Sequence, residues 1–157
     1  ANSTFLVFPA LLFSNNNNDY ISAFEIIGCI VWISFFVLEH IADLQKQRFL
    51  VKSKKQKLKN QVCNIGLWKY TRHPNYFSEW MLWNSLIILG LLSLNSYNFE
   101  NTILIGIVIF LIYTSFLMYR TLVFLTGAIP SEYYSEQKRP FYKKYKESTS
   151  RFFPKIF

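Results

Sequence analysis

Residues 68–80 read Trp-Lys-Tyr-Thr-Arg-His-Pro-Asn-Tyr-Phe-Ser-Glu-Trp and lead directly into an apolar segment. Polar and ionisable groups at the edge of a bilayer core are costly unless they are paired or hydrated, so this density of them indicates a site. The side chains in question are Lys69, Arg72, His73, Asn75, Tyr76 and Glu79. An interfacial anchor is the alternative, because Trp, Tyr, Lys and Arg also collect at the headgroup level. Anchoring leaves the His73-Pro74-Asn75 run and Glu79 unexplained.

The composition places this stretch in a membrane protein. The chain has 157 residues, of which 52% are hydrophobic and 17% charged, and its formal net charge is +8. Apolar blocks joined by basic connectors predict one all-helical membrane domain over residues 1–157, surrounded by membrane lipids. No Lys/Arg stripe is interleaved with a soluble core, which argues against a nucleic-acid partner.

The lengths of the apolar blocks predict about three transmembrane helices, over residues 21–42, 79–94 and 102–129. Residues 5–13 form a shorter apolar segment, too short for a full span. Residues 43–78 are predicted to be a hydrophilic connector, and residues 131–157 a basic helical tail.

The distribution of charge predicts that the connector and the tail lie on one side of the membrane. Seven Lys/Arg lie in the tail, and nine lie between Leu44 and Ser78 with no acid among them. The short segment 95–101 carries only Glu100. Because basic loops stay on the cytoplasmic side, residues 68–80 and the tail are expected at the same face.

His73-Pro74 resembles a helix start, since proline at the first helical position loses no needed hydrogen bond. The amino-terminal end of a helix favours an anion, and Lys69 and Arg72 lie just outside it. This combination suits a phosphate, which leaves Asn75 and Tyr76 to orient a neutral polar group such as a carboxamide. No metal site is predicted, because neither cysteine has metal-ligand spacing to a histidine.

The tail repeats the pattern of basic and aromatic residues. Ser131 is a candidate helix cap, and Pro140 is expected to start a new helical turn. Lys138 and Tyr142 are spaced i, i+4 and Tyr142 and Tyr145 i, i+3, which would place them on one helix face. A basic amphipathic tail lying on anionic lipid is the alternative interpretation.

Three motifs together resemble the membrane reductase superfamily that includes the carboxyl-terminal domain of steroid 5-alpha-reductase and the sterol C14 reductases. They are Ala42-Asp43-Leu44-Gln45-Lys46-Gln47-Arg48-Phe49, the stretch from Gly66 to Trp80, and the segment from Lys138-Arg139-Pro140 through Tyr142 and Tyr145 to Thr149-Ser150-Arg151-Phe152-Phe153-Pro154. The resemblance covers about residues 39–157, as the cofactor half. The superfamily has several further amino-terminal spans, so residues 1–38 are expected to be a remnant of the substrate half.

The resemblance implies a membrane-embedded reductase that uses NADPH to reduce a carbon–carbon double bond in an apolar enone-type lipid, such as a steroid, a sterol or a fatty acyl derivative. It implies that Lys46, Arg48, Arg72 and Arg151 bind the phosphates. His73, Asn75, Tyr76 and Glu79 would surround the nicotinamide and its ribose, and Tyr142 and Tyr145 would close the site. Tyr76 or Glu79 would deliver the proton, and the sequence does not choose between them.

Two other function classes stay open. The isoprenylcysteine carboxyl methyltransferases share an Arg-His-Pro-x-Tyr motif and use S-adenosylmethionine, although Asn75 and the Thr149–Pro154 segment favour the reductase. The second class is a non-catalytic accessory subunit of a larger membrane complex, packed against other membrane subunits. The sequence leaves the endoplasmic reticulum and the mitochondrial inner membrane both open as the location.

Overall fold

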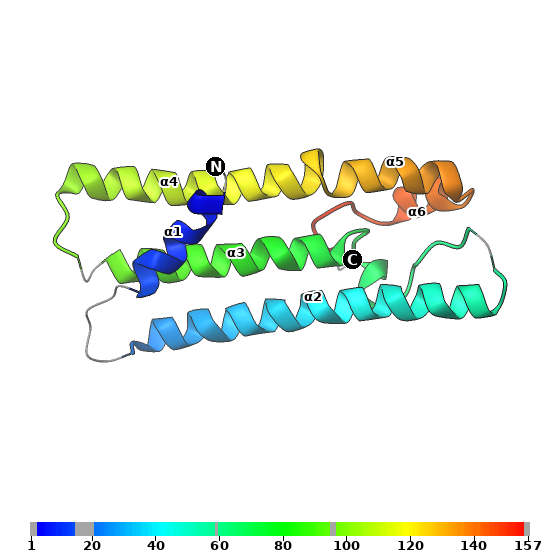
Figure 1. Cartoon of the computed structure of the whole chain (residues 1–157), viewed down its shortest axis with the longest axis horizontal. Helices are drawn as coiled ribbons and strands as arrows, with labels where there is room; N and C mark the ends of the chain where they lie inside the picture. Colours follow the sequence, from blue (N-terminus) through cyan, green and yellow to red (C-terminus); the bar gives the residue numbers. More distant parts are fainter. Residues whose placement is uncertain (1–2, 15–20, 59, 95–96, 156–157) are drawn as a thin grey trace. The chain divides into compact units, whose positions relative to one another are not determined.

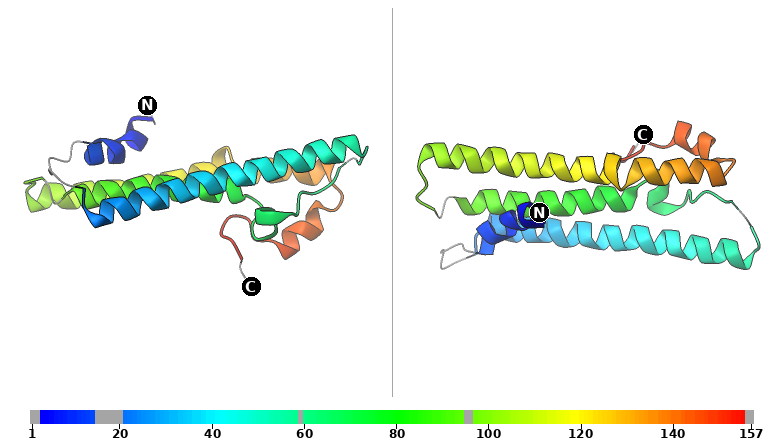
Figure 2. Two further views of the ribbon diagram at one scale, coloured as in Figure 1. Left: turned by 90° about the horizontal axis from the view of Figure 1, so that it is seen from below. Right: turned by 45° about the horizontal axis from the view of Figure 1, so that its top comes forward.

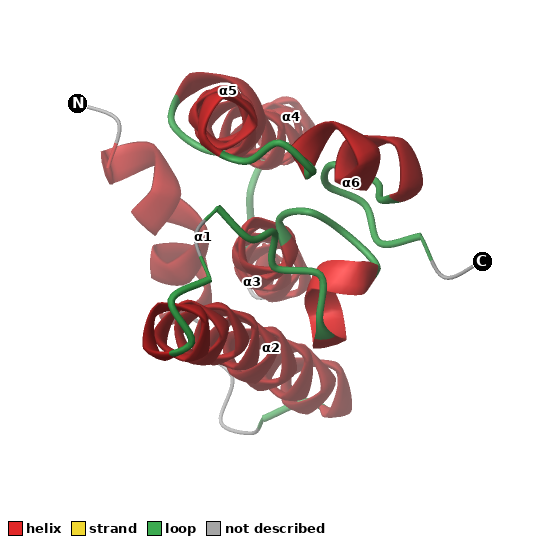
Figure 3. Cartoon of the chain, turned by 90° about the vertical axis from the view of Figure 1, so that its right-hand side faces the viewer, coloured by secondary structure: helices red, strands yellow, loops and turns green. Residues whose placement is uncertain are grey.

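A computed structural model describes residues 3–14, 21–58, 60–94 and 97–155 of the chain, and within these residues every regular element is a helix (Figures 1 and 3). Lys59, one of the basic connector residues, lies outside them. The elements in chain order are α1 (Ser3–Ser14), α2 (Ala23–Lys55), the 3₁₀-helix η1 (Gly66–Lys69), α3 (Pro74–Ser93), α4 (Asn101–Arg120), the π-helix η3 (Thr121–Leu125), α5 (Ala128–Lys138) and α6 (Tyr142–Ser148).

Local sequence explains where the helices begin. At the start of α2 the Ser22 backbone N–H donates to Glu25 at 2.7 Å, and the Glu25 N–H donates back to the Ser22 hydroxyl at 3.2 Å. This reciprocal pair is a capping box, which satisfies amide groups that a helix start leaves free. Helix α3 begins at Pro74, as the sequence predicts.

Two breaks separate the helices of the carboxyl-terminal part. Before α5, a side-chain carbon on Gly127 would lie 1.8 Å from the Leu122 carbonyl oxygen, so only glycine fits there. After α5, Arg139 is extended because Pro140 follows it. The expected i, i+4 pairing of Lys138 with Tyr142 is therefore wrong, since the two residues lie in different helices. Ser131 is not a cap either, because α5 already begins at Ala128.

Helix α2 continues beyond its apolar part, whereas the sequence analysis assigns residues 43–78 to a connector. The helix reaches Lys55 because residues 43–55 are mostly good helix formers, and its last turn carries Lys52, Lys54 and Lys55. Positive charge at this end of a helix is favourable. The connector is accordingly shorter, running from the end of α2 to α3.

The chain divides into two compact units, and each has its own packing. The first comprises residues 1–35 and 80–119. In it Leu12 of α1, Ile87 of α3, Leu94 directly after α3 and Leu111 of α4 form an apolar core. Phe8 packs edge-to-face on Phe110 with ring centroids 5.3 Å apart. The short helix α1 therefore packs with α3 and α4 in this unit.

The second unit comprises residues 36–79 and 120–157, and it contains the motif around His73. In this unit the segment after α6 runs beside the residues that follow η1 (Figure 2). The Arg72 N–H donates to the Ser150 carbonyl at 2.8 Å, and the Lys155 N–H donates to the Tyr70 carbonyl at 2.9 Å. The tail is thus tied to the motif through backbone hydrogen bonds.

Two helical stretches, Glu25–Lys55 and Asn101–Lys138, are long and apolar enough to cross a membrane. Only 17% of the most apolar window of each is buried within the chain, which suits lipid or protein neighbours better than a soluble core. The expected number of about three spans is not confirmed. Helix α3 has the length, but Asn75, Ser78 and Glu79 make its first turns polar.

Candidate functional site

The motif 66–80 is fixed to helix α2 by two side chains. Gln45 of α2 accepts a hydrogen bond from the Leu67 N–H at 2.9 Å, and the Trp68 indole N–H donates to the Ala42 carbonyl at 2.9 Å. The chain can approach Gln45 this closely because Gly66 has a positive φ of 53° and no side chain. Trp68 is 2% exposed, so it anchors the motif from a buried position.

Glu132 of α5 is a buried acid of the second unit, 3% exposed. Its Oε1 atom lies 2.8 Å from Arg72 Nε and 3.2 Å from His73 Nε2, and its Oε2 atom lies 3.2 Å from Arg151 Nε. Arg72 also donates to the carbonyl groups of Lys146 and Thr149. One carboxylate therefore joins α5 to the start of α3 and to the tail.

The sequence analysis missed Glu132. Its available signal was an acid between the apolar run and the basic tail, with Glu136 four residues later, but no spacing rule pairs it with residues 59 and 60 positions away. Arg72 and Arg151, which the resemblance assigns to phosphates, both pair with this carboxylate. The assignment of these two arginines to cofactor phosphates stays a prediction. In the structure both guanidinium groups pair with Glu132.

His73 is 4% exposed, and burial lowers its pKa, although the hydrogen bond to Glu132 opposes that shift. The imidazole is consequently neutral near pH 7. Because a carboxylate only accepts, Nε2 carries the proton in this contact. The ring also stacks on Tyr76, with centroids 5.3 Å apart and an interplanar angle of 1°. His73 thus links the Glu132 cluster to the first turn of α3.

Tyr142 and Tyr145 lie together on α6, with ring centroids 5.8 Å apart, and both are buried. The Tyr145 hydroxyl donates to the Trp68 carbonyl. Burial raises the pKa of Tyr142 to about 12 and raises that of Tyr145 as well, so both hydroxyls are neutral. Tyr145 therefore joins the tail to the motif, and closure of a cofactor site by the two tyrosines stays a prediction.

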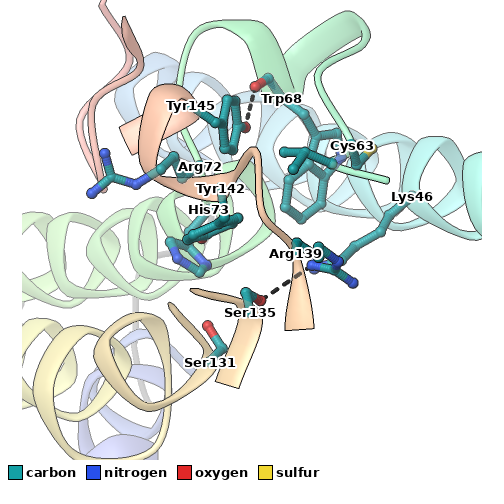
Figure 4. A pocket seen from close by; sticks show the side chains of 11 residues that line it. Lys46, Cys63, Trp68, Arg72, His73, Ser131, Ser135, Arg139, Tyr142 and Tyr145 are labelled. Atoms are coloured by element: carbon teal, nitrogen blue, oxygen red, sulfur yellow. Dashed lines mark hydrogen bonds between the residues drawn. The ribbon is translucent and has the colours of Figure 1, made fainter. Parts of the chain in front are cut away.

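A small polar pocket lies among α2, η1, α5 and α6 (Figure 4). Its volume is about 40 Å³. Its lining includes Lys46, Arg72, His73, Ser135, Arg139 and Tyr142. Lys46 also lies over the Trp68 ring, with Nζ 4.2 Å from the ring centroid. The pocket has room for a few water molecules or one small ion.

A larger hollow of about 320 Å³ lies on another side of the same unit, and its surface is mainly apolar. Leu38 of α2, Leu67 and Tyr70 near η1, Pro74 and Phe77 of α3, and Pro154 of the tail supply most of the lining. The hollow therefore suits an apolar group. It shares the first turn of α3 with Asn75 and Tyr76.

Asn75 carries the unusual atom of this turn. Its Oδ1 is buried and has no hydrogen-bond partner among the described residues. A buried acceptor of this kind costs free energy unless something satisfies it. Tyr76 is half-buried beside it, and burial together with the Glu79 charge raises the Tyr76 pKa. Glu79 is also half-buried, with Asp43 and Glu39 of α2 as acidic neighbours.

The remaining candidates lie elsewhere. Arg48 lines a shallow groove on α2 with Lys52 and Lys55, and Lys69 is exposed at the end of η1. Of the sequence candidates, Lys46, Arg72, His73, Tyr142 and Tyr145 share the polar pocket. Within the described residues, no group of three or more His, Cys, Asp or Glu could hold a metal ion.

Fold and site together define an all-helical protein with two helices of membrane-spanning length and a buried polar cluster formed by a central motif and the tail. The chain belongs to the family described as protein of unknown function (DUF1295), whose model matches residues 2–149. It is similar to the uncharacterized protein C594.04c of Schizosaccharomyces pombe, at 24% identity over 156 residues. That match covers 89% of this chain and 42% of the yeast protein, so the chain spans less than half of its relative. No solved structure matches the chain significantly.

Proposed function

We propose that this chain is the nucleotide-binding part of a membrane-embedded reductase, which uses NADPH to reduce a carbon–carbon double bond in an apolar enone-type lipid. The observation that carries the proposal is the buried Asn75 Oδ1 atom without a partner. A carboxamide oxygen in this position can accept a hydrogen bond from the carboxamide of nicotinamide. Satisfying it would recover a cost of about 1–3 kcal/mol, so the binding of such a group is favoured.

The residues around Asn75 fit the same ligand. The neutral His73 ring stacks on Tyr76 and fixes the orientation of the phenol. NADPH supplies the hydride when bound, and the chain supplies position, exclusion of water and a proton. The Tyr76 hydroxyl is the better proton donor of the two candidates. Its raised pKa keeps it protonated near neutral pH. Burial and the Asp43 charge raise the pKa of Glu79 as well, but a carboxyl group starts from a much lower value than a phenol.

The apolar hollow supports a lipid substrate. Its lining residues Pro74 and Phe77 flank Asn75 and Tyr76 in the sequence of α3. An apolar chain in this hollow would replace water on Leu38, Phe77 and Pro154, and burial of apolar area contributes about 25 cal/mol per Å². An enone presents an apolar body with one polar end, which matches a hollow beside a polar turn.

The proposal is tested by following deuterium from NADPH into lipid. Membranes containing the chain are incubated with NADPH that carries deuterium at the transferable position, and extracted lipids are analysed by mass spectrometry. We expect deuterium in a reduced apolar product, and Tyr76→Phe should lower its rate by about 10²-fold or more. Tyr133→Phe is the matched control, because that tyrosine is exposed on α5. Label that never enters lipid, or equal rates in Tyr76→Phe and the wild type, would contradict the assigned chemistry.

A non-catalytic role as a subunit of a membrane complex is the second candidate. The observation that favours it is the exposed apolar surface of the two long helices, including Ile30, Ile33, Ile109 and Ile112. Partner subunits could cover such a surface as well as lipid can. Mild-detergent purification distinguishes the two. A subunit would migrate only with its partners and would transfer no deuterium, whereas the proposed reductase keeps nucleotide binding when purified alone.

A further inference from the structure

The polar pocket of Figure 4 holds two positive charges that the chain does not neutralise. Lys46 extends from α2 toward Arg139, which follows α5, and their charges repel one another. Neither side chain forms an ion pair within the described residues; Arg139 donates instead to the Ser135 hydroxyl at 3.2 Å. Asp43, one turn before Lys46, is exposed and adds only a weak opposing charge.

Arg72 belongs to the same lining, but its charge is already compensated. Its guanidinium group points away from the Lys46 ammonium and the Arg139 guanidinium in Figure 4, and it pairs with Glu132 at 2.8 Å. Glu132 in turn is bound by three side chains, so it has little capacity left to neutralise the pocket. The unbalanced charge therefore belongs to Lys46 and Arg139 rather than to the motif arginine.

The other groups in the lining donate hydrogen bonds or are neutral. Ser135 and Tyr142 contribute hydroxyls, and the raised pKa of Tyr142, about 12, keeps its proton in place. The Ser131 hydroxyl already donates to the Ala128 carbonyl at 3.0 Å. Burial raises the pKa of the Cys63 thiol, which disfavours a competing thiolate in the pocket. His73 is neutral and already directed at Glu132. The lining itself contains no acidic residue.

We infer that this pocket binds a phosphate-type oxyanion, held between Lys46 and Arg139 with the Ser135 and Tyr142 hydroxyls as further donors. Charge-assisted hydrogen bonds from Lys and Arg to phosphate are among the stronger polar contacts in proteins. The volume of about 40 Å³ matches one tetrahedral ion and excludes a whole nucleotide. The assignment of this oxyanion to a particular molecule rests on the proposed function. NADPH carries one phosphate group that NADH lacks, and that group is the candidate occupant.

Calorimetric titration of inorganic phosphate into the purified chain in detergent tests the inference. The variants Lys46→Gln and Arg139→Gln should each weaken phosphate binding about tenfold or more, because each removes a charged contact. Their melting temperatures should change little. Each variant removes a like-charge repulsion, but Lys46→Gln also loses the contact with Trp68 and Arg139→Gln the hydrogen bond to Ser135. Lys143→Gln, on the exposed side of α6, is the matched control and should bind as the wild type does.

Absence of phosphate binding in the wild type, or equal weakening in Lys143→Gln, would overturn the inference. Competition then identifies the source of the oxyanion. Displacement of phosphate by NADPH but not by NADH assigns the pocket to the additional phosphate of NADPH. Phosphate that binds undisturbed by either nucleotide assigns it to a free ion. A chain that binds phosphate but no nucleotide would contradict the proposed function and leave this site standing.

Discussion

Replacing Glu132 by Gln should destabilise the second unit more than any other single change of charge. The carboxylate is 3% exposed and pairs with Arg72, which is itself 6% exposed. Removal of its charge leaves the Arg72 guanidinium in a buried position with two carbonyl acceptors and no counter-ion. Breaking a buried ion pair costs about 3–5 kcal/mol. Because the amide keeps one acceptor oxygen, we expect about 3 kcal/mol.

Thermal unfolding in detergent, followed by circular dichroism, measures this effect. A loss of about 3 kcal/mol corresponds to a fall of roughly 6–12 °C in the melting temperature of a chain of this size. Glu136→Gln is the matched control, one turn later on α5. Its single ion pair with Lys146, at 3.0 Å, joins side chains that are 31% and 33% exposed, so the loss should stay below about 1 kcal/mol. Equal melting temperatures for the two variants would refute the central role of Glu132.

Two further predictions concern the same unit. The pKa values of Tyr142 and Tyr145 are raised in the folded chain, so their contribution to stability is complete below pH 10. It is lost as the pH rises toward 12, because the tyrosines of the unfolded chain ionise first. The melting temperature should therefore fall across this pH range, and a constant melting temperature would contradict the prediction. Gly66→Ala should cost about 2 kcal/mol, because alanine disfavours the positive φ of 53° and would collide with the Gln45 side chain. Gly106→Ala, in open space on α4, should instead raise the free energy of unfolding slightly, and a similar loss in both variants would rule out this cause.

Local features of the fold were predictable from the sequence. Pro74 marks the start of α3 because proline suits the first helical position whatever surrounds it. The end of α2 was not predictable by hydropathy, since its last turns are polar yet helical. The break at Arg139 and Pro140 follows from a steric rule that outweighs the i, i+4 spacing of Lys138 and Tyr142.

The site was only partly predictable, for a different reason. Motif spacing predicts His73, Asn75 and Tyr76 as site residues because they lie at a helix start, and this stays a prediction. Glu132 pairs with Arg72 across 60 positions, and only the tertiary fold brings these residues together. Arg139 likewise faces Lys46 only after α2 and α5 have packed. Long-range electrostatic partners leave no periodic signal in a single sequence.

Nucleotide binding by Asn75→Leu tests the central claim most directly. Leucine has a similar size and removes the buried Oδ1 atom that has no partner, so we expect the free energy of unfolding to rise by about 1 kcal/mol. Asn84→Leu is the matched control on the same helix. Its amide donates to the Trp80 carbonyl at 2.7 Å and accepts from the Ser115 hydroxyl at 2.6 Å, so its loss should destabilise the chain.

The measurement is the dissociation constant of NADPH, from fluorescence titration of the purified proteins, with S-adenosylmethionine titrated in parallel. The account predicts that the wild type binds NADPH, that Asn84→Leu keeps this affinity in its folded fraction, and that Asn75→Leu loses about tenfold or more while becoming more stable. Equal NADPH affinity in Asn75→Leu and the wild type, or binding of S-adenosylmethionine in place of NADPH, would contradict it.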